Sequence, residues 1–171
     1  MGALMRPRLF ATLLSLSCLS ANANAADADF LNSLAGDWDG GGMVLTKIGG
    51  KKVNVSCNLK SSASASSVSM NGSCSALAVL TRSFSAYVKA AGQRYTGNYT
   101  GPSGQPSRLV GSRKGDALNF NVTWARVTNG DRNAIMMIEK VGQNGLRLQT
   151  VDRDPASGRS VVTSRIDLQR Q

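Results

Sequence analysis

Asp37 and Asp39 are the residues whose type and spacing come nearest to acid/base machinery. They flank Trp38, so on a β-strand both carboxylates would point to the same side. Two such carboxylates can divide the general acid and general base roles of a hydrolytic reaction. No other acid, base or nucleophile gathers near them in the sequence, and the chain contains no histidine. We therefore interpret the pair as the polar face of a strand, and we predict a protein that is not an enzyme and has no catalytic residues.

Side chains suited to metals or cofactors are scarce as well. Without histidine the chain lacks the commonest zinc and haem ligand and the His-assisted nucleophile pairs. The segment Asp152-Arg153-Asp154-Pro155 could supply oxygen ligands to a calcium loop, but it lacks the dense oxygen spacing of such loops. A turn is the simpler interpretation. We predict no metal and no cofactor.

The first 25 residues are predicted to be a secretory signal peptide that is cleaved before Ala26. Arg6 and Arg8 precede an apolar run, Leu9–Leu19, and small residues follow that run. A basic start, a short apolar middle and a small-x-small exit are typical of export signals. The run is too short to span a membrane comfortably. We expect a periplasmic or secreted protein that is not transmembrane; a buried N-terminal helix and lipidation at Cys18 are the alternatives.

Residues 26–171 would then form a single domain with a net charge of +8, because export removes two of the arginines that contribute to the +10 of the whole chain. The composition, 42% hydrophobic and 18% charged, is that of a globular protein. Its basic residues are scattered, and only Lys51-Lys52 and Arg113-Lys114 are adjacent. A cationic surface explains this scatter. An anionic envelope component is the alternative partner, and no nucleic acid is expected.

Cys57 and Cys74 are predicted to form a disulfide bond. They are the two cysteines left after export, and an oxidising compartment makes a bond between them the default. Each lies on the apolar face of an alternating segment, and a serine-rich connection, Lys60–Ser67, separates the segments. The bond would join neighbouring strands.

The dominant hydrophobic period is two residues, which is typical of antiparallel strands with one solvated face. Glycine-rich and proline-containing turns separate the alternating segments. The clearest of these segments are 52–60, 67–74, 118–124, 146–150 and 162–168. The pattern predicts an all-β fold, a single antiparallel up-and-down β-barrel of about 8–10 strands.

The secondary structure of two further segments is less obvious from the pattern. Positions 77–91 fit a helical stripe, but an alternating pattern also runs through them, and we predict a strand over Arg82–Lys89. A short helix at Asp29–Ala35, ended by Gly36, is expected to plug one end of the barrel.

The start and end of the mature chain resemble the calycin superfamily. Leu34-Ala35-Gly36-Asp37-Trp38 gives the Gly-x-Trp opening, and Arg165 and Arg170 lie in or after the last strand. The resemblance implies that the tryptophan packs at the closed end against a basic side chain of the final strand. Gly36, Trp38 and Arg165 are thus the expected barrel-closure residues. The opening also resembles that of small uncharacterised exported proteins of proteobacteria.

A partial likeness to avidin-type barrels covers Ala117–Trp124 and Leu146–Thr150. It implies that Trp124 lines a ligand pocket. The polar side chains of the first strand that bind biotin in avidins are missing, however, because Gly40-Gly41-Gly42 occupy that region. Small periplasmic metalloprotease inhibitors of calycin type share the size, export signal and single disulfide. In that resemblance Ala26–Asn32 would correspond to the inhibitory arm.

Four aromatic residues on apolar strand faces, Tyr95, Tyr99, Phe120 and Trp124, are the candidate ligand-binding residues. A filled core is the alternative, since barrels of this strand number are either packed or hollow. We predict an exported, non-catalytic barrel that binds a small apolar ligand or a cell-envelope component. The alternative is a protein-binding module, such as a periplasmic protease inhibitor or a host-facing surface protein.

Overall fold

The computed structural model describes residues 20–77 and 79–171, which form a helix followed by ten strands. The helix α1 is Ser20–Ser33. The strands are β1 (Gly36–Leu45), β2 (Lys52–Ser64), β3 (Ser67–Ala76), β4 (Leu80–Ala91), β5 (Arg94–Thr100), β6 (Pro106–Lys114), β7 (Ala117–Thr128), β8 (Asp131–Val141), β9 (Gly145–Arg153) and β10 (Ser160–Arg170). Most of the predicted signal peptide, Cys18 included, lies outside the described residues.

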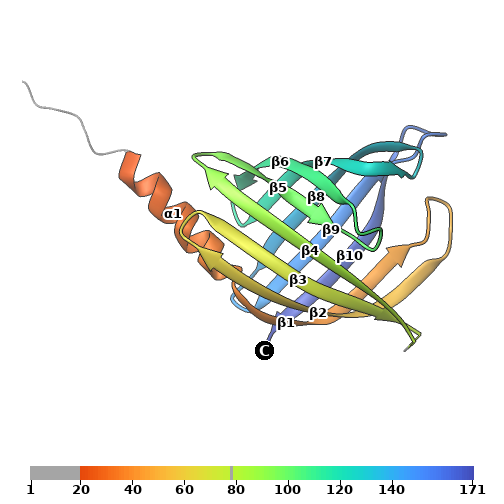
Figure 1. The fold of residues 1–171 in the computed structure, drawn as a ribbon, viewed down its shortest axis with the longest axis horizontal. Helices are drawn as coiled ribbons and strands as arrows, with labels where there is room; N and C mark the ends of the chain where they lie inside the picture. The colour runs from red at the N-terminus through yellow and green to blue at the C-terminus, as the bar shows by residue number, and fades with distance from the viewer. Residues whose placement is uncertain (1–19, 78) are drawn as a thin grey trace, which may run out of the picture.

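The strands close into one antiparallel barrel in which each strand pairs with its neighbours in sequence (Figure 1). β1 also pairs with β10, from Trp38 opposite Arg170 to Val44 opposite Ser164, and this ladder completes the ring. The predicted all-β up-and-down barrel is confirmed. The strand predicted over Arg82–Lys89 is confirmed as part of β4, and the helical alternative there is wrong.

The two ends of the barrel differ (Figure 1). At the closed end lie α1, the start of β1, the end of β10, and the β2–β3, β4–β5, β6–β7 and β8–β9 turns. At the open end lie the β1–β2, β3–β4, β5–β6, β7–β8 and β9–β10 loops. Within residues 20–77 and 79–171, no helix has both the length and the hydropathy to cross a membrane.

The glycine run of β1 allows that strand to pack tightly between its two neighbours. A Cβ atom added at Gly40 or Gly42 would come within 2.3 or 1.9 Å of a backbone oxygen of β10, and one added at Gly41 within 2.4 Å of a backbone oxygen of β2. Real side chains do not tolerate such distances, so the closing ladder requires the absence of side chains here. The run is therefore structural.

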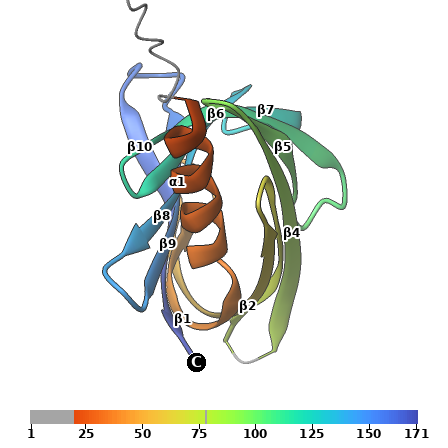
Figure 2. The ribbon, with the colours of Figure 1, turned by 90° about the vertical axis from the view of Figure 1, so that its left-hand side faces the viewer.

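Helix α1 covers the closed end (Figure 2). Phe30, Leu31 and Leu34 are buried there with the barrel core, as expected of a plug. The helix begins earlier than the predicted Asp29 because the alanine-rich segment before it has a high helix propensity. It also ends earlier, at Ser33, and Gly36 begins β1 with a positive φ of 140°. The predicted cleavage before Ala26 falls inside α1.

Arg113 of β6 anchors the helix. Its guanidinium lies 4.2 Å from the Phe30 ring centroid, and its Nη1 donates hydrogen bonds to the Ala26 carbonyl (2.8 Å) and the Asp27 carboxylate (3.1 Å). Segment 26–32, the arm implied by the inhibitor resemblance, is thus helical and packed against the barrel.

Trp38 closes the barrel under Arg170, not under the predicted Arg165. The Arg170 guanidinium lies 4.2 Å from the Trp38 ring and donates to the Ser33 carbonyl at 2.8 Å, while the Trp38 indole N–H donates to the Leu34 carbonyl at 3.2 Å. Arg165 points outward and pairs with Asp167 at 3.1 Å. The alternation of β10 explains the correction, because position 170 shares the inward face of buried Ile166 and Leu168.

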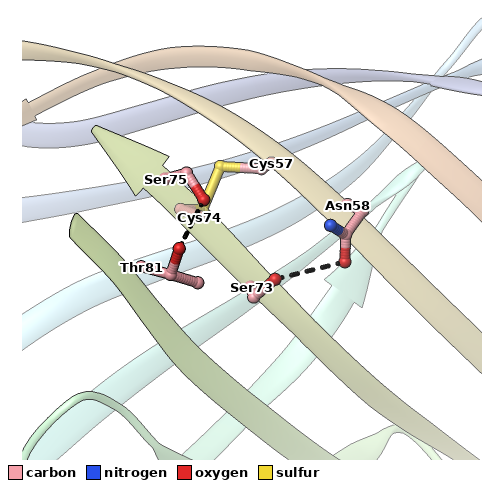
Figure 3. The surroundings of a disulfide bond; sticks show 6 residues. All are labelled: Cys57, Asn58, Ser73, Cys74, Ser75 and Thr81. Carbon is pink, nitrogen blue, oxygen red and sulfur yellow. Dashed lines mark hydrogen bonds between the residues drawn. A yellow bond between two sulfur atoms is a disulfide. The ribbon is translucent and has the colours of Figure 1, made fainter. Parts of the chain in front are cut away.

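The predicted disulfide is confirmed. Cys57 and Cys74 lie directly opposite each other on β2 and β3, with Cα atoms 4.1 Å apart (Figure 3). Two side-chain hydrogen bonds flank the bond on the outer surface, Ser73 to Asn58 at 3.3 Å and Ser75 with Thr81 at 2.8 Å. Closing a loop of this size stabilises the fold by about 3 kcal/mol in the chain-entropy description.

Candidate functional site: a cavity at the open end

The open half of the barrel contains a cavity of about 470 Å³. On β2 and β9 the inward side chains become smaller or more polar from the closed to the open end, and this leaves space beside them. The inward series is Leu59, Cys57, Val55 and Val53 on β2, and Leu146, Leu148, Thr150 and Asp152 on β9. Large buried side chains fill the closed half, among them Leu109, Leu118 and Phe120.

Three aromatic side chains form one wall of this cavity. Phe84 of β4, Tyr99 of β5 and Trp124 of β7 all line it. The Phe84 and Tyr99 ring centroids are 6.5 Å apart, and the Tyr99 and Trp124 rings meet edge to face at 6.1 Å. Burial raises the pKa of the Tyr99 phenol above its ordinary value. The wall is therefore apolar, and it favours the neutral form of its one phenol more than water does.

The hydrogen-bonded wall of the barrel is incomplete beside these aromatic side chains. The β3–β4 ladder continues to the pair Ala76 and Leu80, but the β4–β5 ladder begins only at Ser85 opposite Thr100. Residues Leu80–Phe84 thus extend beyond the paired part of β5. A second hollow lies at this position, between the start of β4 and the β5–β6 loop, and Phe84 and Arg82 line both hollows.

The four predicted ligand residues separate into two pairs. Tyr99 and Trp124 line the cavity. Tyr95 and Phe120 do not; both are fully buried in the filled half. Tyr95 lies beside Asp27 of α1, and burial, followed by the nearby Asp27 carboxylate, raises its pKa. These two residues belong to the plugged core.

Asp152 is the polar feature of the cavity. Its side chain is only 3% exposed and lines the apolar space. Its Oδ1 accepts a hydrogen bond from the Trp124 indole at 3.4 Å, and its Oδ2 accepts one from the Thr163 hydroxyl. None of the ion pairs within the described part of the chain includes Asp152. The carboxylate is thus held by neutral donors, and it can accept a further hydrogen bond from a ligand.

The sequence interpretation placed Asp152 in a turn, and the structure corrects this. Asp154 is the turn residue: its carboxylate accepts hydrogen bonds from the Ser157 hydroxyl at 2.5 Å and the Ala156 N–H at 3.0 Å. These hydrogen bonds lower the pKa of Asp154. Asp152 belongs to β9, where it continues the inward series of Leu146, Leu148 and Thr150. Extending that alternation by one step would have located it.

Strict alternation through the segment 162–168, with Ile166 and Leu168 inward, predicts Thr163 on the outer face, and the structure corrects this as well. The β9–β10 register shifts between Val162 and Ser164. This irregularity turns Thr163 inward (6% exposed) and Val162 outward (38% exposed). A strict period of two does not reveal such a shift.

Asp37 and Asp39 lie on the outer face of β1, toward the closed end and away from the cavity. Both are exposed, and Asp37 forms an exposed ion pair with Lys60 at 3.7 Å. Their interpretation as the polar face of a strand is confirmed.

Comparisons with known proteins add information on the fold. Neither a family model nor a curated protein sequence matches this chain. Among solved structures the chain is similar to the crystal structure of Rv2717c from M. tuberculosis, with a TM-score of 0.65 and 16% sequence identity over 86% of this chain and 98% of that one. At this identity the similarity shows a shared barrel fold.

Proposed function

We propose that the protein binds a small, largely apolar molecule in the cavity at the open end. The observation that carries this proposal is a hollow of about 470 Å³ with an aromatic wall and one buried carboxylate. Ligand pockets typically have volumes of about 300–1,000 Å³, apolar walls and a few polar groups that fix orientation. The cavity fits that description, and no catalytic role is proposed for its residues.

Asp152 determines which apolar molecules suit the cavity. Burying a carboxylate in apolar surroundings costs free energy unless hydrogen-bond donors contact its oxygens. Its protein donors here are the Trp124 indole and the Thr163 hydroxyl, both neutral. A ligand with an amine or a hydroxyl group would add a donor, whereas an ionised acid would place two negative charges together. We expect long-chain amines and alcohols to bind better than carboxylates of the same length.

We also propose that the barrel works outside the cytoplasm. The Cys57–Cys74 bond supports this location, since such bonds persist in oxidising compartments. The basic and apolar segment ahead of Ala25 supports export as well.

The location of the ligand is tested by filling the cavity. Ala86 of β4 lines the hollow, so Ala86→Phe would occupy part of it. We expect this variant to bind the neutral dye Nile red at least about 10-fold more weakly than the native protein, because a phenyl group excludes ligand volume. Lys89→Phe places the same ring on the exposed outer face of the same strand and should leave dye binding unchanged. Equal dye affinities for the native protein and Ala86→Phe would place the ligand elsewhere.

The role of Asp152 is tested by titrating a dodecyl amine, alcohol and carboxylate against the native protein and Asp152→Asn. We expect the variant to lose about 10-fold in amine affinity, because a hydrogen bond to a charged group contributes more than one to a neutral amide. Its relative affinity for the carboxylate should rise. Asp37→Asn removes a carboxylate from the closed end and is the control. An unchanged order of the three ligands would remove Asp152 from the binding site.

A further inference from the structure

The open end carries most of the excess positive charge of the protein. We define the open rim as the described residues of the five loops at that end together with the three strand residues on either side of each loop. It holds nine basic residues, all of them exposed: Lys47, Lys51, Lys52, Arg82, Arg108, Arg126, Arg132, Arg153 and Arg159. Three aspartates accompany them, and one of these is the buried Asp152. The rim therefore accounts for +6 of the +8 expected for the exported chain.

Within the described residues, no cation of the rim forms an ion pair with a carboxylate. The five ion pairs in the described part of the chain, which involve Asp27, Asp37, Glu139 and Asp167, all lie outside the rim. Rim arginines instead donate to neutral acceptors, Arg126 to the Gln105 side chain at 2.8 Å and Arg132 to the Trp124 carbonyl at 2.7 Å. Their positive charge remains available to an anionic partner.

Exposed aliphatic side chains lie among these cations. Leu77 and Val79 in the β3–β4 loop are each 87% exposed, and Val127 beside the β7–β8 turn is 67% exposed. Leu80 and Val162 also belong to the rim, so five of the eight large hydrophobic residues that are exposed in the described part of the chain gather at this one end. Scattered apolar side chains need no explanation, but their concentration at loop tips does.

We infer that the open rim docks on an anionic lipid surface. The juxtaposition of exposed Leu77, Val79 and Val127 with unpaired lysines and arginines fits the interface of an acidic bilayer. There, aliphatic tips enter the acyl boundary and basic side chains contact anionic headgroups. The phosphates of a nucleic acid would bind the basic side chains, but a nucleic acid has no apolar phase into which exposed leucine and valine side chains could be buried. The cavity opens at the same end, so docking would bring its mouth to the membrane.

Two sets of variants separate docking from general charge attraction. The charge variant is Lys47→Gln, Lys51→Gln and Lys52→Gln, and the aliphatic variant is Leu77→Ser, Val79→Ser and Val127→Ser. The matched control, Lys89→Gln, Arg94→Gln and Lys114→Gln, removes exposed positive charge from the closed end. None of the substituted side chains lines the cavity. Thermal unfolding and Nile red binding show that each variant is folded and that its cavity is intact.

The measurement is co-sedimentation with vesicles of phosphatidylcholine, either pure or containing about one-third phosphatidylglycerol. We expect binding to the acidic vesicles, little binding to the neutral ones, and weakening by salt. Both rim variants should lose about 10-fold or more in vesicle affinity, because basic residues near an acidic surface and aliphatic side chains in the acyl boundary each contribute to binding. The closed-end control should retain its affinity within about 2-fold.

Three outcomes would overturn the inference. They are an absence of native binding to acidic vesicles, equal losses for the rim and closed-end variants, and tighter binding of the rim to a DNA duplex than to the vesicles. The inference does not depend on the proposed ligand, because vesicle binding and dye binding are measured separately. A protein that docks without binding Nile red, or the reverse, would show which proposal fails.

Discussion

The closed and open ends of this barrel are built from the same ten strands, yet they differ in how densely the interior is packed and in whether charged side chains form ion pairs. At the closed end a helix, Trp38 and large inward side chains fill the interior. At the open end the inward side chains of β2 and β9 are smaller or more polar, and a cavity of about 470 Å³ lies beside an aromatic wall. The five ion pairs of the described chain lie outside the open rim, whereas the rim cations stay unpaired. The helix plug and the densest packing thus lie at one end, whereas the other end keeps a cavity and unpaired positive charge.

The largest expected effect is a difference in the stability lost when each of the two tryptophans is replaced. Trp38 is 1% exposed and lies within the plugged core, whereas Trp124 is partly exposed and lines the cavity. We expect Trp38→Ala to lower the free energy of unfolding by about 3–5 kcal/mol, since it leaves a large void. Trp124→Ala should cost about 1–2 kcal/mol. Urea denaturation followed by circular dichroism measures both, and equal losses would contradict the division of labour between the two ends.

A smaller effect is expected from the two arginines of β10. Arg170→Met removes the guanidinium from the Trp38 face and from the Ser33 and Ala35 carbonyls, and we expect a loss of about 2 kcal/mol. Arg165→Met removes a half-exposed ion pair with Asp167 and should cost less than about 0.5 kcal/mol. Thermal melts of the two variants measure the difference. A greater loss of stability for Arg165→Met than for Arg170→Met would indicate that Arg165, and not Arg170, closes the barrel.

The smallest expected effect is a dependence of stability on alkaline pH. Burial, aided by Asp27, raises the pKa of Tyr95, and burial raises that of Tyr99. The folded state therefore holds these phenolic protons more tightly than the unfolded chain, whose tyrosines titrate near about pH 10. Their contribution is complete below that pH and is lost as the pH rises above it.

We expect Tyr95→Phe, at the closed end, to flatten the alkaline loss of stability more than Tyr99→Phe does, because Tyr95 has the additional influence of Asp27. Urea midpoints measured between neutral pH and about pH 11 would show this. A larger change for Tyr99→Phe would indicate that the open end governs the alkaline transition.

The fold could be predicted from the sequence because its information is local. Alternation of apolar and polar residues, interrupted by glycine turns, gave the barrel, the strand at Arg82–Lys89 and the inward position of both cysteines. The helix was placed too late because the alanine-rich segment ahead of it belonged to the predicted signal peptide. Arg165 was chosen over Arg170, although the alternation through Ile166 and Leu168 places the latter on the inner face.

The candidate site was predicted only in part because it depends on register. Tyr99 and Trp124 were identified from their apolar faces, but so were Tyr95 and Phe120, and only the position along the barrel axis separates the two pairs. Thr163 was hidden by the irregularity in β10. Asp152 is an aspartate at an inward position, and a polarity pattern alone assigns such a residue to the surface.

The chain enters and leaves the barrel at the same place. α1 leads into β1 at the closed end, where Gln171 donates its backbone N–H to the Asp37 carbonyl at 3.0 Å. An affinity tag, a fluorescent fusion or a surface linker attached after Gln171 would therefore hold the molecule by its closed end and leave the open end unobstructed (Figure 1). Immobilised in that orientation, the protein can be offered ligands or vesicles directly.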